Sequence, residues 1–359
     1  MRIADQLRGA SRLAIAATTG VTDIVEAMHA EIGRVPLTGL VYRSVRGVTR
    51  LVGSGLDLSL HALTPLLGQA DTRRADALIA ALNGVLGDYL EDTANPLAIA
   101  MSLHPLAGDE GQPALVFLHG LCMNEVQWLR AAGEGSASFP AELAALGYRA
   151  LGLRYNSGRA VGRNGAELAA LLEDVPGPLT LLGHSMGGLV ARSAIAQAQA
   201  QGLRWPARLR GLVTLGTPHL GAPLERGGQQ VQQLLAASAY SRPLALLAAR
   251  RSAGIRDLRY GRLLETDTGR VKAVTVPLPL PAGVACYAVA AKKTKSADSA
   301  PTHWQGDGLV PVASALGHHR LIARRLAFTD TAVFPGLGHL GLQTDAAVLA
   351  QLKQWLSPA

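Results

Sequence analysis

From about residue 110 onward, short apolar runs alternate with stretches that have helical periodicity. The runs are ALVFLHG, YRALGLRY, PLTLLGHS, LRGLVTLGTPH, GVACYAVAA and LAFTDTAVFP, and segments such as FPAELAALG, GAELAALLEDV and GGLVARSAIAQAQAQ lie between several of them. This alternation is typical of a mostly parallel sheet with helices on both faces. Because apolar residues occupy consecutive positions in the runs, we expect strands that are buried on both sides. The sequence therefore predicts an α/β fold.

Residues 1–105 lack this alternation, and their apolar residues recur at three- and four-residue spacing. We expect an all-helical N-terminal extension over 1–105 and a separate sheet domain over 106–359. In the segment GLVYRSVRGVTRLVG, apolar residues share one helical face and the arginines lie largely off it. Two interpretations stay open: this face packs on the neighbouring domain, or the cationic helix makes peripheral contact with a membrane.

Between residues 222 and 280 the alternation lapses, and the sequence indicates two or three short helices joined by loops. An insertion at this position predicts a helical lid over the mouth of the sheet. The longest uncharged run, residues 273–291, contains Pro277, Pro279 and Pro281, which would break a membrane-spanning helix. We therefore expect no transmembrane segment.

Charge and cysteine content exclude several classes of protein. The net charge of +8 comes almost entirely from scattered arginines, without a nucleic-acid motif, so we expect no nucleic-acid partner. Cys122 and Cys286 form no disulfide framework, which suits a reducing compartment. Near the N-terminus, Asp23 and Glu26 closely follow a short apolar stretch, which favours an amphipathic helix over a secretory signal. We expect a cytoplasmic protein, and membrane association stays open.

A serine stands at the point where the run PLTLLGHS gives way to a helix-like stretch. The residues GHSMG at 183–187 fit the pattern G-x-S-x-G around Ser185. A serine hydroxyl is a poor nucleophile unless a base takes its proton and the developing oxyanion is stabilised. In a sharp strand-to-helix turn, small flanking residues relieve crowding and the hydroxyl projects from the sheet. We interpret Ser185 as a nucleophile rather than an incidental turn serine.

The motifs GHSMGG, LHG at 118–120 and GTPHLG at 216–221 resemble the α/β-hydrolase superfamily, and within it the bacterial lipase and esterase branch. The resemblance covers about residues 112–357 and leaves the first hundred unmatched. It implies the α/β-hydrolase fold and a serine carboxylic-ester hydrolase, an esterase or lipase, that acts on an ester or lipid through an acyl-enzyme. It implies no cofactor. Two alternatives stay open: an acyltransferase with the same groups, and a non-catalytic binding protein of this fold.

In this superfamily the nucleophile, acid and histidine follow one another along the chain. Asp307, in GDGLVP after the run GVACYAVAA, resembles the acid turn of the branch. The alternative is an aspartate that only forms an Asp-Gly turn. The rival carboxylates fit less well, because one lies at the last strand and two lie in the expected lid: Asp330, Asp267 and Glu225.

The base is expected just after the last strand, where LGHLG places His339. His339 would take the proton from Ser185 and return it to the leaving alcohol, while Asp307 orients the imidazole. The backbone amides of Leu121 and Met186 are the expected oxyanion donors.

The remaining site residues are predicted from their positions in the motifs. Trp128 and the lid leucines would form an apolar mouth for acyl chains. We expect the side chain of His184 to pack beside the turn and that of His219 to structure the loop above the site. His119 ends a strand. His318 and His319 lack matched carboxylates, so we expect surface residues and no metal site.

Overall fold

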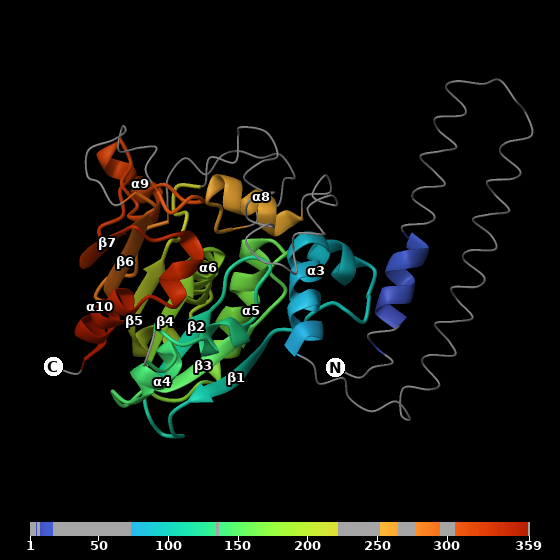
Figure 1. Ribbon diagram of the computed structural model, residues 1–359, viewed down its shortest axis with the longest axis horizontal. Coiled ribbons are helices and arrows are strands. Elements are labelled where there is room, and N and C mark those ends of the chain that lie inside the picture. Colours follow the sequence, from blue (N-terminus) through green and yellow to red (C-terminus); the bar gives the residue numbers. More distant parts are fainter. Residues whose placement is uncertain are drawn as a thin grey trace, which may run out of the picture. The chain divides into compact units, whose positions relative to one another are not determined.

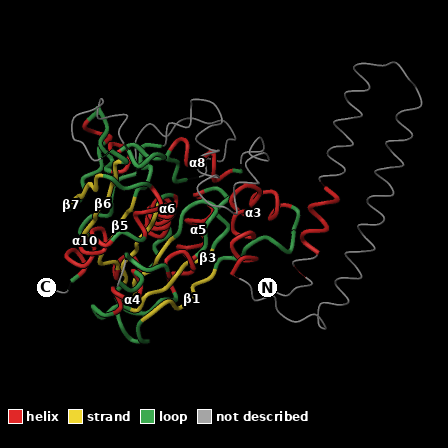
Figure 2. Tube along the Cα trace, in the orientation of Figure 1, coloured by secondary structure: helices red, strands yellow, loops and turns green. Residues whose placement is uncertain are grey.

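The structure, a computed structural model, describes residues 5, 8–16, 73–133, 136–221, 252–264, 278–294 and 306–357. Seven strands form one sheet in the order β1-β3-β2-β4-β5-β6-β7 (Figure 1; strands in yellow in Figure 2). Only β1 is antiparallel to its neighbour, and every other adjacent pair is parallel. The strands are β1 (Ser102–Ala107), β2 (Ala114–Leu118), β3 (Arg149–Arg154), β4 (Leu179–His184), β5 (Leu209–Leu215), β6 (Ala285–Lys292) and β7 (Asp330–Pro335). The predicted α/β class and the mostly parallel sheet are confirmed.

Helices cover both faces of the sheet, and the side chains of β2 show how the faces differ. Val116 and Leu118 pack in a core with α5 and α6, whereas Leu115 and Phe117 pack in a second core with α4 and α10. The helices are α3 (Arg73–Asp92), α4 (Phe139–Ala144), α5 (Val161–Glu173), α6 (Met186–Ala200), α8 (Ala253–Tyr260), α9 (Val312–Ala315) and α10 (Ala346–Leu356), and the short 3₁₀ turns are η1 (Glu125–Leu129), η2 (Trp205–Arg208), η4 (Ile322–Arg324) and η5 (His339–Gln343). The four strands β2, β3, β4 and β5 thus follow apolar runs because both of their faces are buried.

The expectation of helix throughout residues 1–105 is wrong at its end, because Ser102–Ala107 is strand β1. This strand lies at the sheet edge, most of its residues are half-buried, and its register with β3 shifts between Pro105 and Ala107. A proline has no N–H to donate and is tolerated in edge strands. The strand therefore lacks both the apolar run and the strict alternation by which a strand is recognised.

Contacts divide the chain into two compact units, and the division passes through α3. One unit is Met1–Asp76 with Tyr89–Ala98, and the other is Ala77–Asp88 with Ile99–Ala359. The middle of α3 therefore belongs to the same unit as the sheet. The predicted independence of residues 1–105 as an extension stays a prediction.

Most of the expected lid at 222–280 lies outside the described residues. Its described part contains α8, and residues 278–280 lead toward β6. The cationic segment at 39–53 also lies outside them. Within the described ranges, no helix has the length and apolar character needed to cross a bilayer.

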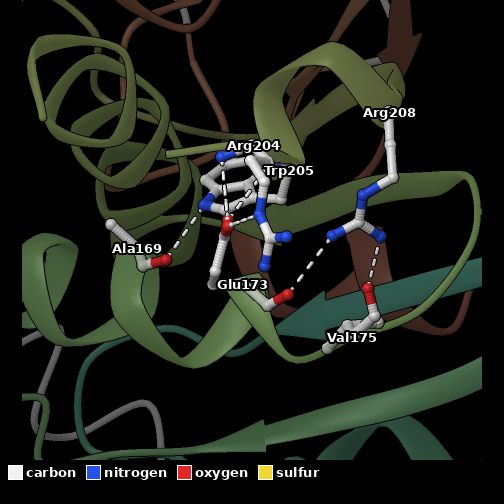
Figure 3. A network of polar contacts seen from close by, with 6 residues as sticks. All are labelled: Ala169, Glu173, Val175, Arg204, Trp205 and Arg208. Atoms are coloured by element: carbon white, nitrogen blue, oxygen red, sulfur yellow. Dashed lines mark hydrogen bonds and ion pairs between the residues drawn. The ribbon is translucent and has the colours of Figure 1, made fainter. Parts of the chain in front are cut away.

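A polar network joins the ends of α5 and η2 near the start of β4 and β5 (Figure 3). The Glu173 carboxylate accepts hydrogen bonds from the backbone N–H groups of Arg204 and Trp205 and from Arg204 Nε at 2.7 Å. Arg208 donates to the carbonyl of Val175, beyond the end of α5. These contacts hold the amino ends of the two strands whose carboxyl ends meet at Ser185.

Candidate active site

Ser185 lies alone between the end of β4 at His184 and the start of α6 at Met186. Its backbone has φ 54° and ψ −120°, a conformation that a residue with a side chain rarely adopts. The Ser185 N–H donates to the carbonyl of Leu215 at the end of β5, at 2.8 Å. A strained residue of this kind persists only where its surroundings hold it, and such strain is concentrated at functional sites.

The glycines on both sides of Ser185 are required by space. A Cβ on Gly183 would lie 2.4 Å from Gly188 N, and a Cβ on Gly187 would lie 2.4 Å from the Leu118 carbonyl oxygen. Both obstacles are backbone atoms, which cannot move aside cheaply. The G-x-S-x-G spacing therefore follows from the strand-turn-helix geometry at this position.

Asp307 and His339 form a buried pair. His339 Nδ1 donates to Asp307 Oδ2 at 2.7 Å, and the side chains are 4% and 1% exposed. The other oxygen, Oδ1, accepts the backbone N–H groups of Leu309 at 2.9 Å and Val310 at 2.8 Å. One oxygen of Asp307 therefore accepts within the turn and the other accepts from the imidazole, while its role as the acid stays a prediction.

The pKa of Asp307 lies below its usual value. Burial alone would raise this pKa, but the charge and hydrogen bond of His339 and the amides of Val310 and Leu309 together outweigh it. The carboxyl is therefore ionised at neutral pH and accepts from Nδ1. Because Nδ1 carries the proton, Nε2 of the neutral ring has the free lone pair of a base.

The pair lies next to the loop that follows β5. A Cβ on Gly216 would be 3.1 Å from Asp307 Oδ2 and 3.2 Å from His339 Cε1, and the preceding carbonyl of Leu215 binds the amide of Ser185. In the part of the chain that the structure describes, His339 Nε2 is buried without a hydrogen-bond partner, so no bond joins it to Ser185 Oγ. Hydrogen bonds of this kind are often long in ligand-free enzymes and shorten when substrate binds.

The two expected oxyanion donors belong to segments that adjoin Ser185. Met186 is the first residue of α6, so its amide has no acceptor within the helix. Leu121 follows Gly120, and a Cβ on Gly120 would lie 3.2 Å from Ser185 Cβ. The loop after β2 therefore lies against the strand-to-helix turn at Ser185.

Three further histidines are fully or almost fully buried beside this site. His184 Nε2 donates to the His339 carbonyl at 3.0 Å, and His119 Nδ1 donates to the Gly120 carbonyl at 2.8 Å. His219 bonds to Thr214 Oγ1 at 3.2 Å, so it braces the loop after β5. Burial lowers the pKa of His119 to about 4; for His184, burial and then the charge of His339 lower the pKa to about 3. Burial and Arg192 hold the pKa of His219 well below its usual value.

We expect these histidines to make the fold acid-sensitive. The unfolded chain binds their protons near pH 6.5, whereas the folded chain does not until the pH is far lower. Unfolding therefore takes up protons, and the free energy of unfolding falls as the pH drops below 6.5. The slope approaches about 1.4 kcal/mol per pH unit for each histidine at about one unit below pH 6.5, or about 4 kcal/mol per pH unit for three. Urea unfolding between pH 5 and 6.5 measures it.

Two variants test this origin of the acid sensitivity. His119→Phe keeps a ring beside Tyr155, on which His119 is stacked at 4.2 Å, and should remove about a third of the slope. His318 is exposed, so His318→Gln should leave the slope unchanged. A parent protein with constant stability across this pH range would contradict the prediction.

Trp128 lies within the core. Its side chain is fully buried, with its ring centroid 5.1 Å from that of Phe117 and 6.4 Å from that of His184. The contact of Trp128 with substrate stays a prediction. Trp128 packs beneath the turn at Ser185.

The sequence did not indicate Arg192 or Ser157. An arginine within a helix normally suggests a solvated face, yet Arg192 is 3% exposed and donates to His219 Nδ1 at 3.1 Å. Ser157 accepts the backbone N–H of Cys122 at 3.0 Å from a loop that follows β3. Neither position belongs to a motif, so only the fold brings them to the site.

His318 is exposed and His319 is half-buried. Over the described ranges, no cluster of three or more histidine, cysteine, aspartate or glutamate side chains could hold a metal ion.

The order and direction of the strands, with a serine in the turn after the third parallel strand of the chain, define an α/β-hydrolase fold. Residues 168–262 match the family model described as PGAP1-like alpha/beta domain, which is less than half of the chain. No protein of curated function gives a significant match to the sequence.

Several solved structures of hydrolases are similar to this chain at low identity. The lipase BlEst2 of Bacillus licheniformis in its mature form has a TM-score of 0.47 and 20% identity, over 72% of this chain and 98% of the lipase. A bacterial membrane phospholipase A has a TM-score of 0.45 and 16% identity, over 88% and 97%. A putative aryl esterase from Burkholderia cenocepacia has a TM-score of 0.42 and 16% identity, over 72% and 96%.

Proposed function

We propose that this protein is a serine carboxylic-ester hydrolase of the esterase or lipase type. The observation that carries the proposal is the buried hydrogen bond between His339 Nδ1 and Asp307 Oδ2, which leaves Nε2 without a partner in a ring whose centroid lies 4.7 Å from that of His184, the residue before the strained Ser185. The substrate is an acylglycerol, a phospholipid or a simpler ester, and activity on esters of increasing chain length narrows this choice.

In the proposed reaction, Ser185 Oγ attacks the ester carbonyl carbon and its proton passes to His339 Nε2. The negative charge on the carbonyl oxygen is stabilised by the amides of Leu121 and Met186 and by the positive end of α6. The alcohol leaves with the proton from His339, and an acyl group remains on Ser185. Water then attacks the acyl carbon and gives a proton to His339, which passes it to Ser185 Oγ as the bond to the acyl group breaks and the acid leaves. Asp307 keeps the ring in the required tautomer and stabilises its charged form.

A panel of p-nitrophenyl esters with acyl chains of increasing length tests the proposal. We expect turnover that saturates with substrate, and the chain-length profile then separates an esterase from a lipase. Addition of an alcohol separates the acyltransferase alternative, because a transferase would form the new ester at the expense of the acid. Absence of turnover on every ester would favour the non-catalytic alternative.

A further inference from the structure

The loop that carries Leu121 holds a strained residue, Cys122. Its φ of 60° lies in the left-handed region, which residues other than glycine occupy only when neighbouring groups hold them there. One such group is Ser157, whose Oγ accepts the Cys122 N–H at 3.0 Å and whose side chain is 1% exposed. The hydrogen bond fixes the orientation of the peptide unit between Leu121 and Cys122.

The second group is the backbone of α3. A Cβ on Gly84 would lie 2.2 Å from Cys122 Sγ and 2.8 Å from both Cys122 N and Cα. The helix therefore touches the backbone of the loop, and no larger residue fits. Glycine within a helix costs about 1 kcal/mol relative to alanine, and this close approach accounts for its presence.

Hydrogen bonds to the surrounding loops hold α3 at this distance. Asn156, the residue before Ser157 in the chain, donates from Nδ2 to the Gly87 carbonyl at 2.9 Å. The Gly84 carbonyl accepts from Ser252 Oγ at 2.8 Å, and Asp88 Oδ2 accepts the first amide of α8 at 3.0 Å. All of these residues belong to the same unit as the sheet.

We propose that the Ala77–Asp88 part of α3 positions the loop after β2 that carries Leu121 and Cys122, and that Gly84 and Ser157 are positioning residues. The inference rests on the proposed function, because the Leu121 amide acts only if an oxyanion forms. Preorganised donors stabilise a transition state because they need not reorient, and a displacement of about 1 Å can cost about 10²-fold in rate. Part of the segment before the sheet is thus a component of the site.

Gly84→Ala and Gly165→Ala form a matched pair for the first test. Both add one methyl group within a helix, and the Cβ on Gly165 would lie 2.1 Å from Ser193 Oγ, between α5 and α6. We expect Gly84→Ala to lower kcat for a p-nitrophenyl ester by roughly 10- to 100-fold with KM within about twofold. Gly165→Ala should keep kcat within about twofold of the parent, even if it lowers Tm as much as Gly84→Ala does.

Ser157→Thr and Ser157→Val form the second pair. Threonine and valine have the same branched shape and nearly the same volume, but only threonine keeps the oxygen that accepts the Cys122 N–H. Any loss caused by volume is therefore common to the two variants. We expect kcat of the valine variant to lie roughly 10-fold or more below that of the threonine variant, with similar KM. The comparison of the two Ser157 variants tests the positioning of the loop even if Gly84→Ala fails to fold.

The Cys122 thiol offers a readout that needs no turnover. Cys122 is 6% exposed, and burial raises its pKa to about 12, so it should resist alkylation in the parent. Cys286 is 2% exposed, and burial raises its pKa to about 11, which makes it an internal reference. We expect iodoacetamide, followed by peptide mass spectrometry, to label Cys122 faster in Gly84→Ala while Cys286 is unchanged.

Equal kcat in the two members of each pair, with Cys122 as protected in Gly84→Ala as in the parent, would overturn the inference. Equal acceleration at both thiols would also overturn it, because it indicates general loosening of the fold. Failure of the proposed function has a different signature: Ser185→Ala would keep the activity of the parent in the same assay.

Discussion

Replacement of Ser185 by alanine is expected to lower kcat for ester hydrolysis by a factor of about 10⁴ to 10⁶. The variant lacks the oxygen that forms the acyl-enzyme, whereas His339, Asp307 and the two amides are unchanged. The residual rate would come from substrate binding and oxyanion stabilisation alone. The strained φ of 54° applies to alanine as it does to serine, so we expect the fold to survive. Initial rates with p-nitrophenyl esters measure the effect.

Ser193→Ala is the matched control for that substitution. Ser193 is a buried serine like Ser185, but it belongs to α6, its hydroxyl donates to the Leu263 carbonyl at 2.5 Å, and it lies about two turns along the helix from Ser185. We expect this variant to keep kcat within a few-fold of the parent. Loss of activity in Ser193→Ala together with retention in Ser185→Ala would contradict the assignment of the nucleophile.

The second large effect is expected from Asp307→Asn, with kcat lower by about 10⁴. The carboxylate accepts from His339 Nδ1 and so leaves Nε2 unprotonated. An asparagine can direct its NH₂ group at Nδ1 instead, which would place the ring proton on Nε2 and remove the base. The Oδ1 position can still accept the amides of Leu309 and Val310, so the turn should persist.

The rival carboxylate Asp330 provides the control. It is exposed at the start of β7, where its two oxygens accept Thr331 N at 2.8 Å and Trp355 Nε1 at 2.9 Å. Asp330→Asn should leave kcat within about twofold of the parent, since this carboxylate does not contact His339. If Asp330→Asn lost activity and Asp307→Asn kept it, the acid would have to be reassigned.

The sheet and the turn at Ser185 could be predicted from the sequence because both impose strong local requirements. Strands buried on two faces need consecutive apolar residues, so the runs ending at Leu118, His184 and Leu215 mark β2, β4 and β5 directly. The turn at Ser185 needs glycine at 183 and 187, because a Cβ at either position would lie 2.4 Å from a backbone atom. Requirements of this kind act within a few residues and therefore leave a readable pattern.

Other features depend on contacts between distant segments and leave no such pattern. The amphipathic pattern of α3 predicts a helix but does not reveal that Gly84 lies against Cys122. Trp128 follows a motif that resembles the family's oxyanion loop, yet η1 turns its ring into the core. The burial of Arg192 depends on His219 Nδ1 and the Leu278 carbonyl, which accept hydrogen bonds from its guanidinium. In each case the surroundings of the residue depend on segments that are distant in the sequence.

The most direct test of the proposed nucleophile is mass spectrometry of the protein after reaction with an alkyl fluorophosphonate. Attack by Ser185 Oγ on phosphorus would expel fluoride, pass the hydroxyl proton to His339 and leave a stable adduct. We predict one adduct per chain, located on the peptide that contains Ser185, and a rate of formation that collapses in His339→Ala. An adduct on another residue, or equally fast labelling without His339, would contradict the proposed site.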